Sequence, residues 1–222
     1  MTKPLRETIG IILKTLPRPK KVLEIGSRQA VNQRRMANIR PLLPGVEYIG
    51  VDMHNGHGVD LIANAEKLPF KDGEFDLVIC LETLEHAKRP WMVASEIQRV
   101  LSKEGVAIVS SVLNFPIHMH PSDYFRYTPY GIKSLFENLT ENLVVTISPP
   151  FSGEVRTNPR IVVFVGTKKK YKFLIADIKR DLISQKSAIS VYKPIQHRAQ
   201  DAVKYFVRGL QEMGYKEEIE FF

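Results

Sequence analysis

The sequence predicts an α/β protein with a doubly wound, mostly parallel sheet of seven strands and an antiparallel strand near its C-terminal end. Two observations support this fold class. Short apolar runs alternate along the chain with amphipathic stretches of helical period. The run at 75–81 is almost continuously apolar, as expected for a strand covered on both faces. We expect one domain over residues 1–167 and a helical extension over 168–222, which packs on that domain or on a partner subunit.

Each predicted element has a local reason in the sequence. A helix over 5–16 carries its apolar residues on one face and stops before Pro17. Thr128 and Pro129 suit the cap and first position of a helix that runs to about residue 139. The strands are predicted at 22–25, 47–51, 61–63, 75–81, 106–112, 143–147 and 161–165, the last two as a hairpin-like antiparallel pair. The other helices are predicted at 30–39, 90–101, 173–184 and 199–213.

Composition is that of an ordinary globular protein. Hydrophobic residues make up 44% of the 222 residues, and no run approaches the roughly 18 apolar residues of a membrane span. Cys80 is the single cysteine and the first residues lack the apolar core of a secretory signal, so we expect a cytoplasmic protein. The net charge is +8, with a basic surplus after Lys168. Nucleic acid is therefore an open partner, although a solvated basic surface is the simpler explanation.

Two strand ends point to a nucleotide site. The segment from Lys21 to Ser27 reads as a buried strand that ends in an acidic residue and a glycine, and the strand at 47–51 ends in Asp52. Gly26 lets the backbone approach a ligand closely because it has no Cβ. Asp52 can accept hydrogen bonds from two vicinal ribose hydroxyls. The arrangement predicts a site for an adenosine-like cofactor.

Five segments, in order and in register, carry a family resemblance. They are Val22–Gly26, Gly50–Asp52, Ala63–Phe70, Phe75–Cys80 running into Leu84–His86, and Glu96–Leu101. Together they resemble the class I S-adenosylmethionine-dependent methyltransferases, in particular the small-molecule (type 11) group typified by quinone-biosynthesis enzymes. The stretch from Pro121 to Pro129 is similar to a signature of a bacterial and archaeal subset of that group. The resemblance covers about residues 20 to 167.

The resemblance implies S-adenosyl-L-methionine as the cofactor and assigns it a set of residues. Glu24, Gly26 and Ser27 would hold its methionine end. Asp52 would take the ribose hydroxyls, Met53 would pack on the adenine, Asn64 and Ala65 would meet the adenine edge, and Leu81 would line the floor near the sulfonium. One departure is the absence of the later glycines, since Ser27, Arg28, Gln29 and Ala30 follow Gly26. This argues against a dinucleotide, whose pyrophosphate needs those glycines.

Candidate residues for catalysis and for the acceptor lie past the fourth and fifth predicted strands. We expect His86, His118 or Asp123 to take part in catalysis, with His120 as a further candidate base, because histidine titrates near neutral pH. Tyr124, Arg126 and Tyr127 form an aromatic and basic cluster, which would clamp an acidic or sugar-like acceptor or form a packed lid. We expect no metal site.

The sequence therefore favours a methyltransferase that acts on a small-molecule, glycan or lipid-linked acceptor. Two alternatives stay open: an RNA methyltransferase that uses the basic C-terminal region, and a methyltransferase-fold protein that binds without catalysing. A homodimer is compatible with the apolar stripe predicted in the last helix.

Overall fold

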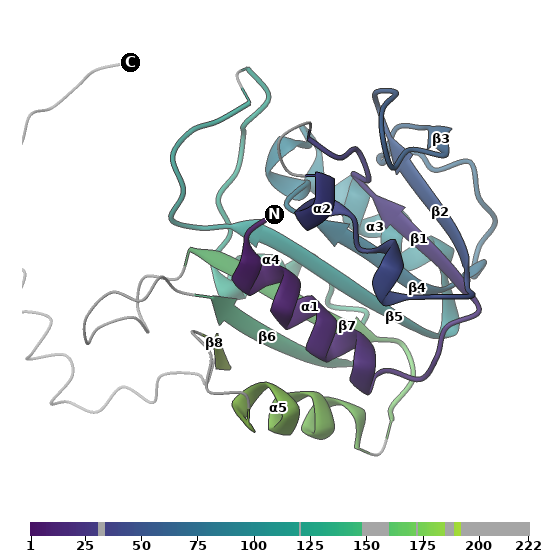
Figure 1. Cartoon of the computed structure of the whole chain (residues 1–222), viewed down its shortest axis with the longest axis vertical. Helices are drawn as coiled ribbons and strands as arrows, with labels where there is room; N and C mark the ends of the chain where they lie inside the picture. Colours follow the sequence, from purple (N-terminus) through teal and green to yellow (C-terminus); the bar gives the residue numbers. More distant parts are fainter. Residues whose placement is uncertain (31–33, 120, 148–159, 172, 185–188, 192–222) are drawn as a thin grey trace, which may run out of the picture. The chain divides into compact units, whose positions relative to one another are not determined.

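The computed structural model describes residues 1–30, 34–119, 121–147, 160–171, 173–184 and 189–191. Figure 1 shows a central sheet with helices on both faces. The described strands form one sheet in the order β3-β2-β1-β4-β5-β7-β6-β8. This is the predicted α/β class, and the order places the ends of β1, β2 and β4 beside one another.

The strands agree closely with the predicted ones. They are β1 (Lys21–Ile25), β2 (Glu47–Asp52), β3 (Leu61–Ile62), β4 (Phe75–Leu81), β5 (Leu101–Val112), β6 (Glu141–Ile147), β7 (Ile161–Thr167) and β8 (Ile189–Val191). The first five pair in parallel. β7 runs antiparallel to both β5 and β6, which confirms the predicted antiparallel strand. The short strand β8, antiparallel to β6, was not predicted.

The helices begin at recognisable signals. They are α1 (Lys3–Thr15), α2 (Arg34–Ala37), α3 (Pro90–Val100), α4 (Pro129–Ser134) and α5 (Leu174–Ser184), with single 3-10 turns η2 (Arg40–Leu42) and η3 (Leu84–His86). At the start of α4 the Thr128 hydroxyl accepts a hydrogen bond from the Gly131 N–H at 3.0 Å. Proline fills one of the first positions of α1, α3 and α4, where its missing N–H costs nothing.

The helix predicted over 30–39 was wrong in length. Within the described residues of that stretch, only α2 is helical, and none of its side chains is buried. A helix without an apolar face gains no packing energy, and so short a helix is marginal by itself. The Asn38 side chain then accepts a hydrogen bond from the Arg40 N–H at 3.2 Å, which turns the chain into η2. The helix predicted at 199–213 lies outside the described residues.

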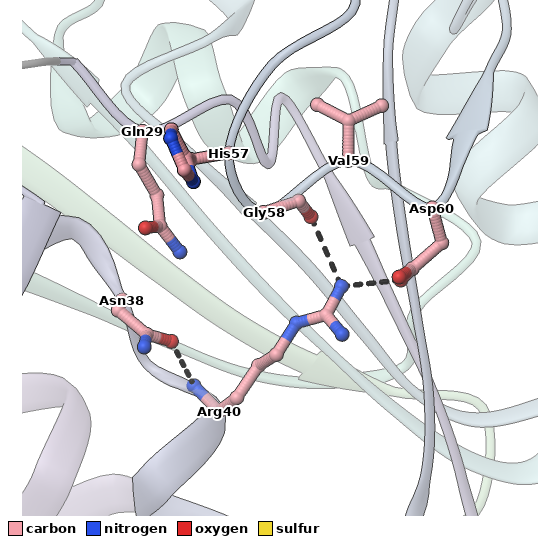
Figure 2. Close-up of a pocket in the computed structure, with 7 residues that line it drawn as sticks. All are labelled: Gln29, Asn38, Arg40, His57, Gly58, Val59 and Asp60. Atoms are coloured by element: carbon pink, nitrogen blue, oxygen red, sulfur yellow. Dashed lines mark hydrogen bonds and ion pairs between the residues drawn. The ribbon is translucent and has the colours of Figure 1, made fainter.

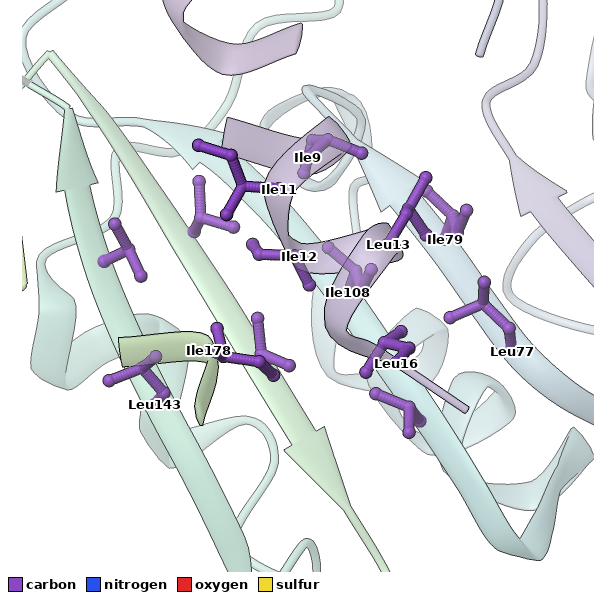
Figure 3. Packing of buried hydrophobic residues seen from close by; sticks show 14 of the residues in the cluster. Ile9, Ile11, Ile12, Leu13, Leu16, Leu77, Ile79, Ile108, Leu143 and Ile178 are labelled. Atoms are coloured by element: carbon purple, nitrogen blue, oxygen red, sulfur yellow. The ribbon is translucent and has the colours of Figure 1, made fainter. Parts of the chain in front are cut away.

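Apolar residues alternate along the strands and fill two core layers, one on each face of the sheet. Ile108 faces the layer of α1 and α5, shown in Figure 3, whereas its neighbour Val109 faces the layer of α3 and α4. Helix α5 adds three buried side chains to the first layer, Leu174, Ile178 and Leu182. The predicted extension thus begins with a helix on the core, while the boundary at 167 stays a prediction.

Among the described helices, none has the length and apolar character needed to cross a membrane.

Candidate functional site

The register of three parallel strands brings the predicted cofactor residues to one edge of the sheet. Ile25 of β1 is paired with Val51 of β2 and with Cys80 of β4. The residues that follow these three, Gly26, Asp52 and Leu81, therefore stand level with one another. This is the edge at which open α/β sheets bind ligands.

Gly26 makes a turn that no other residue fits. Its φ is +75°, and a Cβ at this position would lie 2.1 Å from Oγ1 of Thr83. The N–H groups of Gly26 and Ser27 both donate to the Val51 carbonyl, at 2.9 and 3.1 Å, and the Thr83 hydroxyl donates to the Leu81 carbonyl at 2.9 Å. The backbone of the loop after β1 thus packs against the Thr83 side chain in the loop after β4.

Asp52 is the last residue of β2, and its carboxylate accepts two hydrogen bonds but can accept more. Its side chain is 17% exposed. One oxygen accepts from the His54 N–H at 2.9 Å, and the other accepts a long bond from the Arg28 N–H at 3.4 Å. A carboxylate has about four lone-pair sites, so acceptor capacity remains. Met53 is 62% exposed and Ile62 is 59% exposed, which leaves an apolar surface beside that carboxylate.

Glu24 lies under this edge rather than on it. The carboxyl group is buried and accepts a hydrogen bond from the Tyr48 hydroxyl at 2.8 Å. Burial raises its pKa to about 7, and the Tyr48 bond offsets part of that effect. The guanidinium of Arg40 stands 4.8 Å from the centre of the Tyr48 ring. Close by, Oγ of Ser27 is buried without a hydrogen-bond partner among the described residues.

A polar pocket of about 260 Å³ opens beside Gln29, three residues after Gly26, and its lining residues are drawn in Figure 2. Arg40 bridges it by donating to the Gly58 carbonyl at 3.0 Å and pairing with Asp60. Asp60 also accepts from the Gly50 N–H at 2.7 Å. Sequence reasoning missed Arg40 and Asp60 as site residues, because nothing in their spacing indicates that they pair. The pocket is lined by Gln29, Asn38, Arg40, His57, Gly58, Val59 and Asp60.

Asn64 and Ala65 follow β3 beside Asp52. The Ala63 N–H donates to the Asp52 carbonyl at 2.9 Å, which fixes the start of this loop. Asn64 is exposed, and its side-chain oxygen accepts from the Glu66 N–H at 2.9 Å. Its amide N–H₂ group thus remains available as a donor to the adenine edge, while its oxygen already accepts one hydrogen bond.

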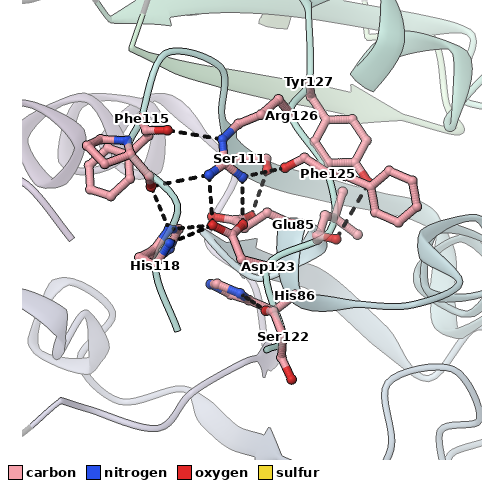
Figure 4. Close-up of polar contacts among 12 residues, drawn as sticks. Glu85, His86, Ser111, Phe115, His118, Ser122, Asp123, Phe125, Arg126 and Tyr127 are labelled. Carbon is pink, nitrogen blue, oxygen red and sulfur yellow. Dashed lines mark hydrogen bonds and ion pairs between the residues drawn. The ribbon is translucent and has the colours of Figure 1, made fainter. Parts of the chain in front are cut away.

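The predicted catalytic residues gather in a second cluster, between η3 and the loop after β5 (Figure 4). The rings of His86 and His118 meet edge to face with their centres 4.8 Å apart. Nδ1 of His86 lies 2.5 Å from the Ser122 carbonyl oxygen. Nδ1 of His118 lies 3.1 Å from a carboxylate oxygen of Asp123. The structure thus brings all three predicted residues together, while His120 lies outside the described residues.

Asp123 and Arg126 are engaged with each other and with the loop. Asp123 is 1% exposed, and both of its oxygens accept from Arg126, at 2.6 and 2.7 Å. The Arg126 bonds hold the pKa of Asp123 well below its usual range. The remaining donors of Arg126 go to the carbonyls of Phe115, Pro116 and Phe125. The pair therefore shapes the loop, and this geometry favours neither Asp123 as a base nor Arg126 as an acceptor clamp.

The two tyrosines predicted to bind the substrate lie in different environments. Tyr127 is 7% exposed and its hydroxyl is 3.5 Å from the Leu84 carbonyl, so it is part of the core. Tyr124 is 39% exposed and stays available for an acceptor. It is anchored through its N–H, which donates to the Glu85 carbonyl at 2.8 Å.

Sequence reasoning missed Glu85. This side chain is fully buried, and one oxygen accepts from the Ser111 hydroxyl at 2.7 Å. The other oxygen has no hydrogen-bond partner among the described residues. Burial raises the pKa of Glu85 to about 7. Its position next to His86, just past a strand tip, was a signal that could have drawn attention to it.

Comparison with known proteins shows which family part of this chain is similar to. Residues 23–109 match a family model described as a methyltransferase domain. An uncharacterized methyltransferase of Mycobacterium sp. (strain KMS) is 33% identical over 76 residues, which are 30% of this chain and 30% of that protein. The chain spans less than half the length of the curated relatives it matches.

Solved structures share the fold at low identity. A Thermotoga maritima protein described as a possible histamine N-methyltransferase has 23% identity and a TM-score of 0.52, over 75% of this chain and 95% of its own. A Burkholderia thailandensis N1-methyltransferase of 1,6-didemethyltoxoflavin, solved with that compound and S-adenosylhomocysteine, has 16% identity and a TM-score of 0.55. That likeness covers 76% of this chain and 79% of the other.

Proposed function

We propose that this chain is a class I S-adenosylmethionine-dependent methyltransferase that transfers a methyl group from S-adenosylmethionine to a small-molecule, glycan or lipid-linked acceptor. The match of residues 23–109 to a methyltransferase-domain model supports this proposal. The observation that carries this proposal is the edge where Gly26 turns beside the Asp52 carboxylate. The cofactor is the one this class uses.

The residues at that edge fit the cofactor. Gly26 turns the chain at this edge against Thr83, and the buried Ser27 hydroxyl still has a hydrogen bond to make. Asp52 retains acceptor sites for two ribose hydroxyls. The exposed Met53 offers an apolar surface for an adenine ring, and Asn64 offers an amide donor for its edge. Glu24 would act from beneath, through its hydrogen bond with Tyr48.

The cofactor supplies a methyl group already activated on sulfur, so the protein mainly has to position the acceptor. Proximity and alignment of this kind are worth roughly 7–11 kcal/mol. The Ser122 carbonyl and the Asp123 carboxylate can only accept, so Nδ1 of His86 and Nδ1 of His118 carry the protons. Nε2 of each ring then keeps a lone pair for a hydroxyl or amine of the acceptor. In this proposal Asp123 positions His118.

Exposed apolar residues support an acceptor with apolar surface. Ile117 is 64% exposed, Met119 is 66% exposed and Tyr124 is 39% exposed, all on the loop that carries His118. In the same loop, Asp123 and Arg126 pair with each other, so their charges are not available to an acceptor. A lipid-linked or aromatic acceptor suits this loop better than a polyanion. The basic surplus on which the RNA alternative rests lies within residues 168–191, where Lys169 and Arg180 already pair with Glu104 and Asp177.

The test is methyl transfer from labelled S-adenosylmethionine into fractionated cell extract. The wild-type chain is compared with D52N and H118A, and with D72A as a control, because Asp72 is an 82% exposed turn residue. We expect label in an organic-soluble or small-molecule fraction with the wild type and D72A, and at least tenfold less with D52N and H118A. Label that disappears on ribonuclease treatment, or no label in any fraction, would contradict the proposal.

A further inference from the structure

We propose that Glu85, His86 and His118 form a binding site for one divalent transition-metal ion of the zinc type. A carboxylate oxygen of Glu85 and a ring nitrogen of each histidine lie within 4.8 Å of one another. Two imidazoles and one carboxylate are a ligand set that zinc ions use in catalytic sites, where the fourth position stays open. The sequence led us to expect no metal, because its spacing did not reveal that Glu85 joins the two histidines.

Both histidines are held in the form that binds a metal. A metal-bound imidazole normally donates its other ring N–H to a carboxylate, carbonyl or water. Here the Nδ1–H of His86 donates to the Ser122 carbonyl at 2.5 Å, and the Nδ1–H of His118 faces Asp123 at 3.1 Å. These bonds fix the ring orientations and leave Nε2 of each ring as a ligand.

The buried carboxylate of Glu85 is a second, independent observation that supports a metal ion here. Its side chain is fully buried, and one carboxylate oxygen has no hydrogen-bond partner among the described residues. A buried carboxylate oxygen without a partner is costly. A cation bound by this oxygen and by the neighbouring histidines would remove that cost. The other oxygen already accepts from Ser111 at 2.7 Å, as an oriented metal ligand does.

The outer partners are themselves fixed. Arg126 holds Asp123 by two bonds of 2.6 and 2.7 Å, and Asp123 in turn accepts from the His118 N–H at 2.8 Å. Zinc ligands at 2.0–2.2 Å in a tetrahedron stand roughly 3.3–3.5 Å apart. The present spread of up to 4.8 Å would close to that value if each ligand atom moved by about 1 Å, with each ring tilting about its Nδ1 hydrogen bond and keeping that bond.

The location gives this metal a role that rests on the proposed function. Glu85 and His86 follow Thr83, whose hydroxyl lies against Gly26 at the cofactor edge. An ion here would stand on the acceptor side of the site. Its open coordination position would bind a hydroxyl or carboxylate oxygen of the acceptor, in place of the direct hydrogen bonds to the histidine rings.

The experiment is a metal titration of the tag-free full chain after removal of metal with a chelator. Zinc binding is followed by calorimetry, and cobalt(II) binding by its visible absorption, in the absence of cofactor. We expect one ion per wild-type chain and at least ~100-fold weaker binding by E85Q, H86A and H118A, beyond the 10–100-fold that losing an outer partner costs. H54A is the matched control, because His54 is a 71% exposed loop histidine, and it should bind like the wild type.

Three results would overturn the metal site: no stoichiometric binding by the wild type, binding unchanged in both E85Q and H118A, or binding lost equally in H54A. If E85Q does not fold, H118A answers the question, because His118 is 29% exposed and its loss leaves no buried group unpaired. S-adenosylhomocysteine binding is measured on the same samples. A chain that binds this compound but no zinc refutes only the metal site, and the reverse result refutes only the cofactor proposal.

Discussion

Replacing Gly26 by alanine should cost the protein both stability and cofactor affinity. A residue with a Cβ pays about 1–2 kcal/mol to adopt the left-handed conformation that Gly26 has at φ +75°. The new methyl group would also lie 2.1 Å from Oγ1 of Thr83. Thr83 must then move and give up its 2.9 Å bond to the Leu81 carbonyl, for roughly 0.5–1.5 kcal/mol. The sum is about 1.5–3.5 kcal/mol of unfolding free energy.

Urea unfolding of G26A, T83A, the G26A/T83A double variant and G10A separates these two contributions. G26A should lose the full amount, and adding T83A to it should recover the steric part, so that the two changes are not additive. G10A is the matched control: Gly10 lies inside α1 with nothing within 4 Å of an added Cβ, and the change should stabilise by about 0.5–1 kcal/mol. If the unfolding free energy of G26A lies within 0.5 kcal/mol of the wild-type value, the proposed strain and steric conflict at this turn are refuted.

Three further changes test other parts of the account. Burial raises the pKa of Glu24 from 4.5 to about 7, so the folded chain holds one more proton than the unfolded chain between these pH values. The unfolding free energy of the wild type should therefore fall by about 3 kcal/mol from pH 4.5 to 7 relative to that of E24Q. Urea unfolding without cofactor measures this difference. A parallel pH dependence of the two proteins would contradict this. F164A should lose about 3–5 kcal/mol, because Phe164 is fully buried and stacks on another ring, and a loss below 1 kcal/mol would argue against that packing. R126A removes both Arg126 bonds from the Asp123 side chain, which is 1% exposed, and should lower the unfolding free energy by about 3 kcal/mol. R180A, on an exposed pair, should leave it nearly unchanged; equal losses would refute the distinction.

The fold was predictable wherever the pattern was periodic and buried. The strand at 75–81 was placed with its observed bounds, because an apolar run between polar residues has one sensible reading as a buried parallel strand. The helix expected after β1 was placed less well, because the described turn of helix α2 buries no side chain and the chain turns at Asn38. Propensity alone does not make a helix there, and only the packing decides it.

The site was predictable at strand ends and unpredictable in the loop after β5. Gly26 and Asp52 stand out because a glycine and a carboxylate follow two strands, and parallel register then brings them level. Inside the loop, the sequence does not reveal which polar groups satisfy one another. Arg126 could have faced an acceptor, but its donors are taken by Asp123 and backbone carbonyls. Glu85 went unnoticed because its burial follows from the contact with Ser111 on β5.

The most direct measurement of the central claim is calorimetric titration of the chain with S-adenosylhomocysteine. The account predicts saturable binding to the wild type, and at least ~10-fold weaker binding to D52A, from losing one or two charge-assisted hydrogen bonds to the ribose at about 1.5–3 kcal/mol each. D72A should bind like the wild type. Equal affinity of D52A and wild type would contradict the assignment of the Asp52 carboxylate to the ribose, and with it the cofactor site proposed at this edge of the sheet.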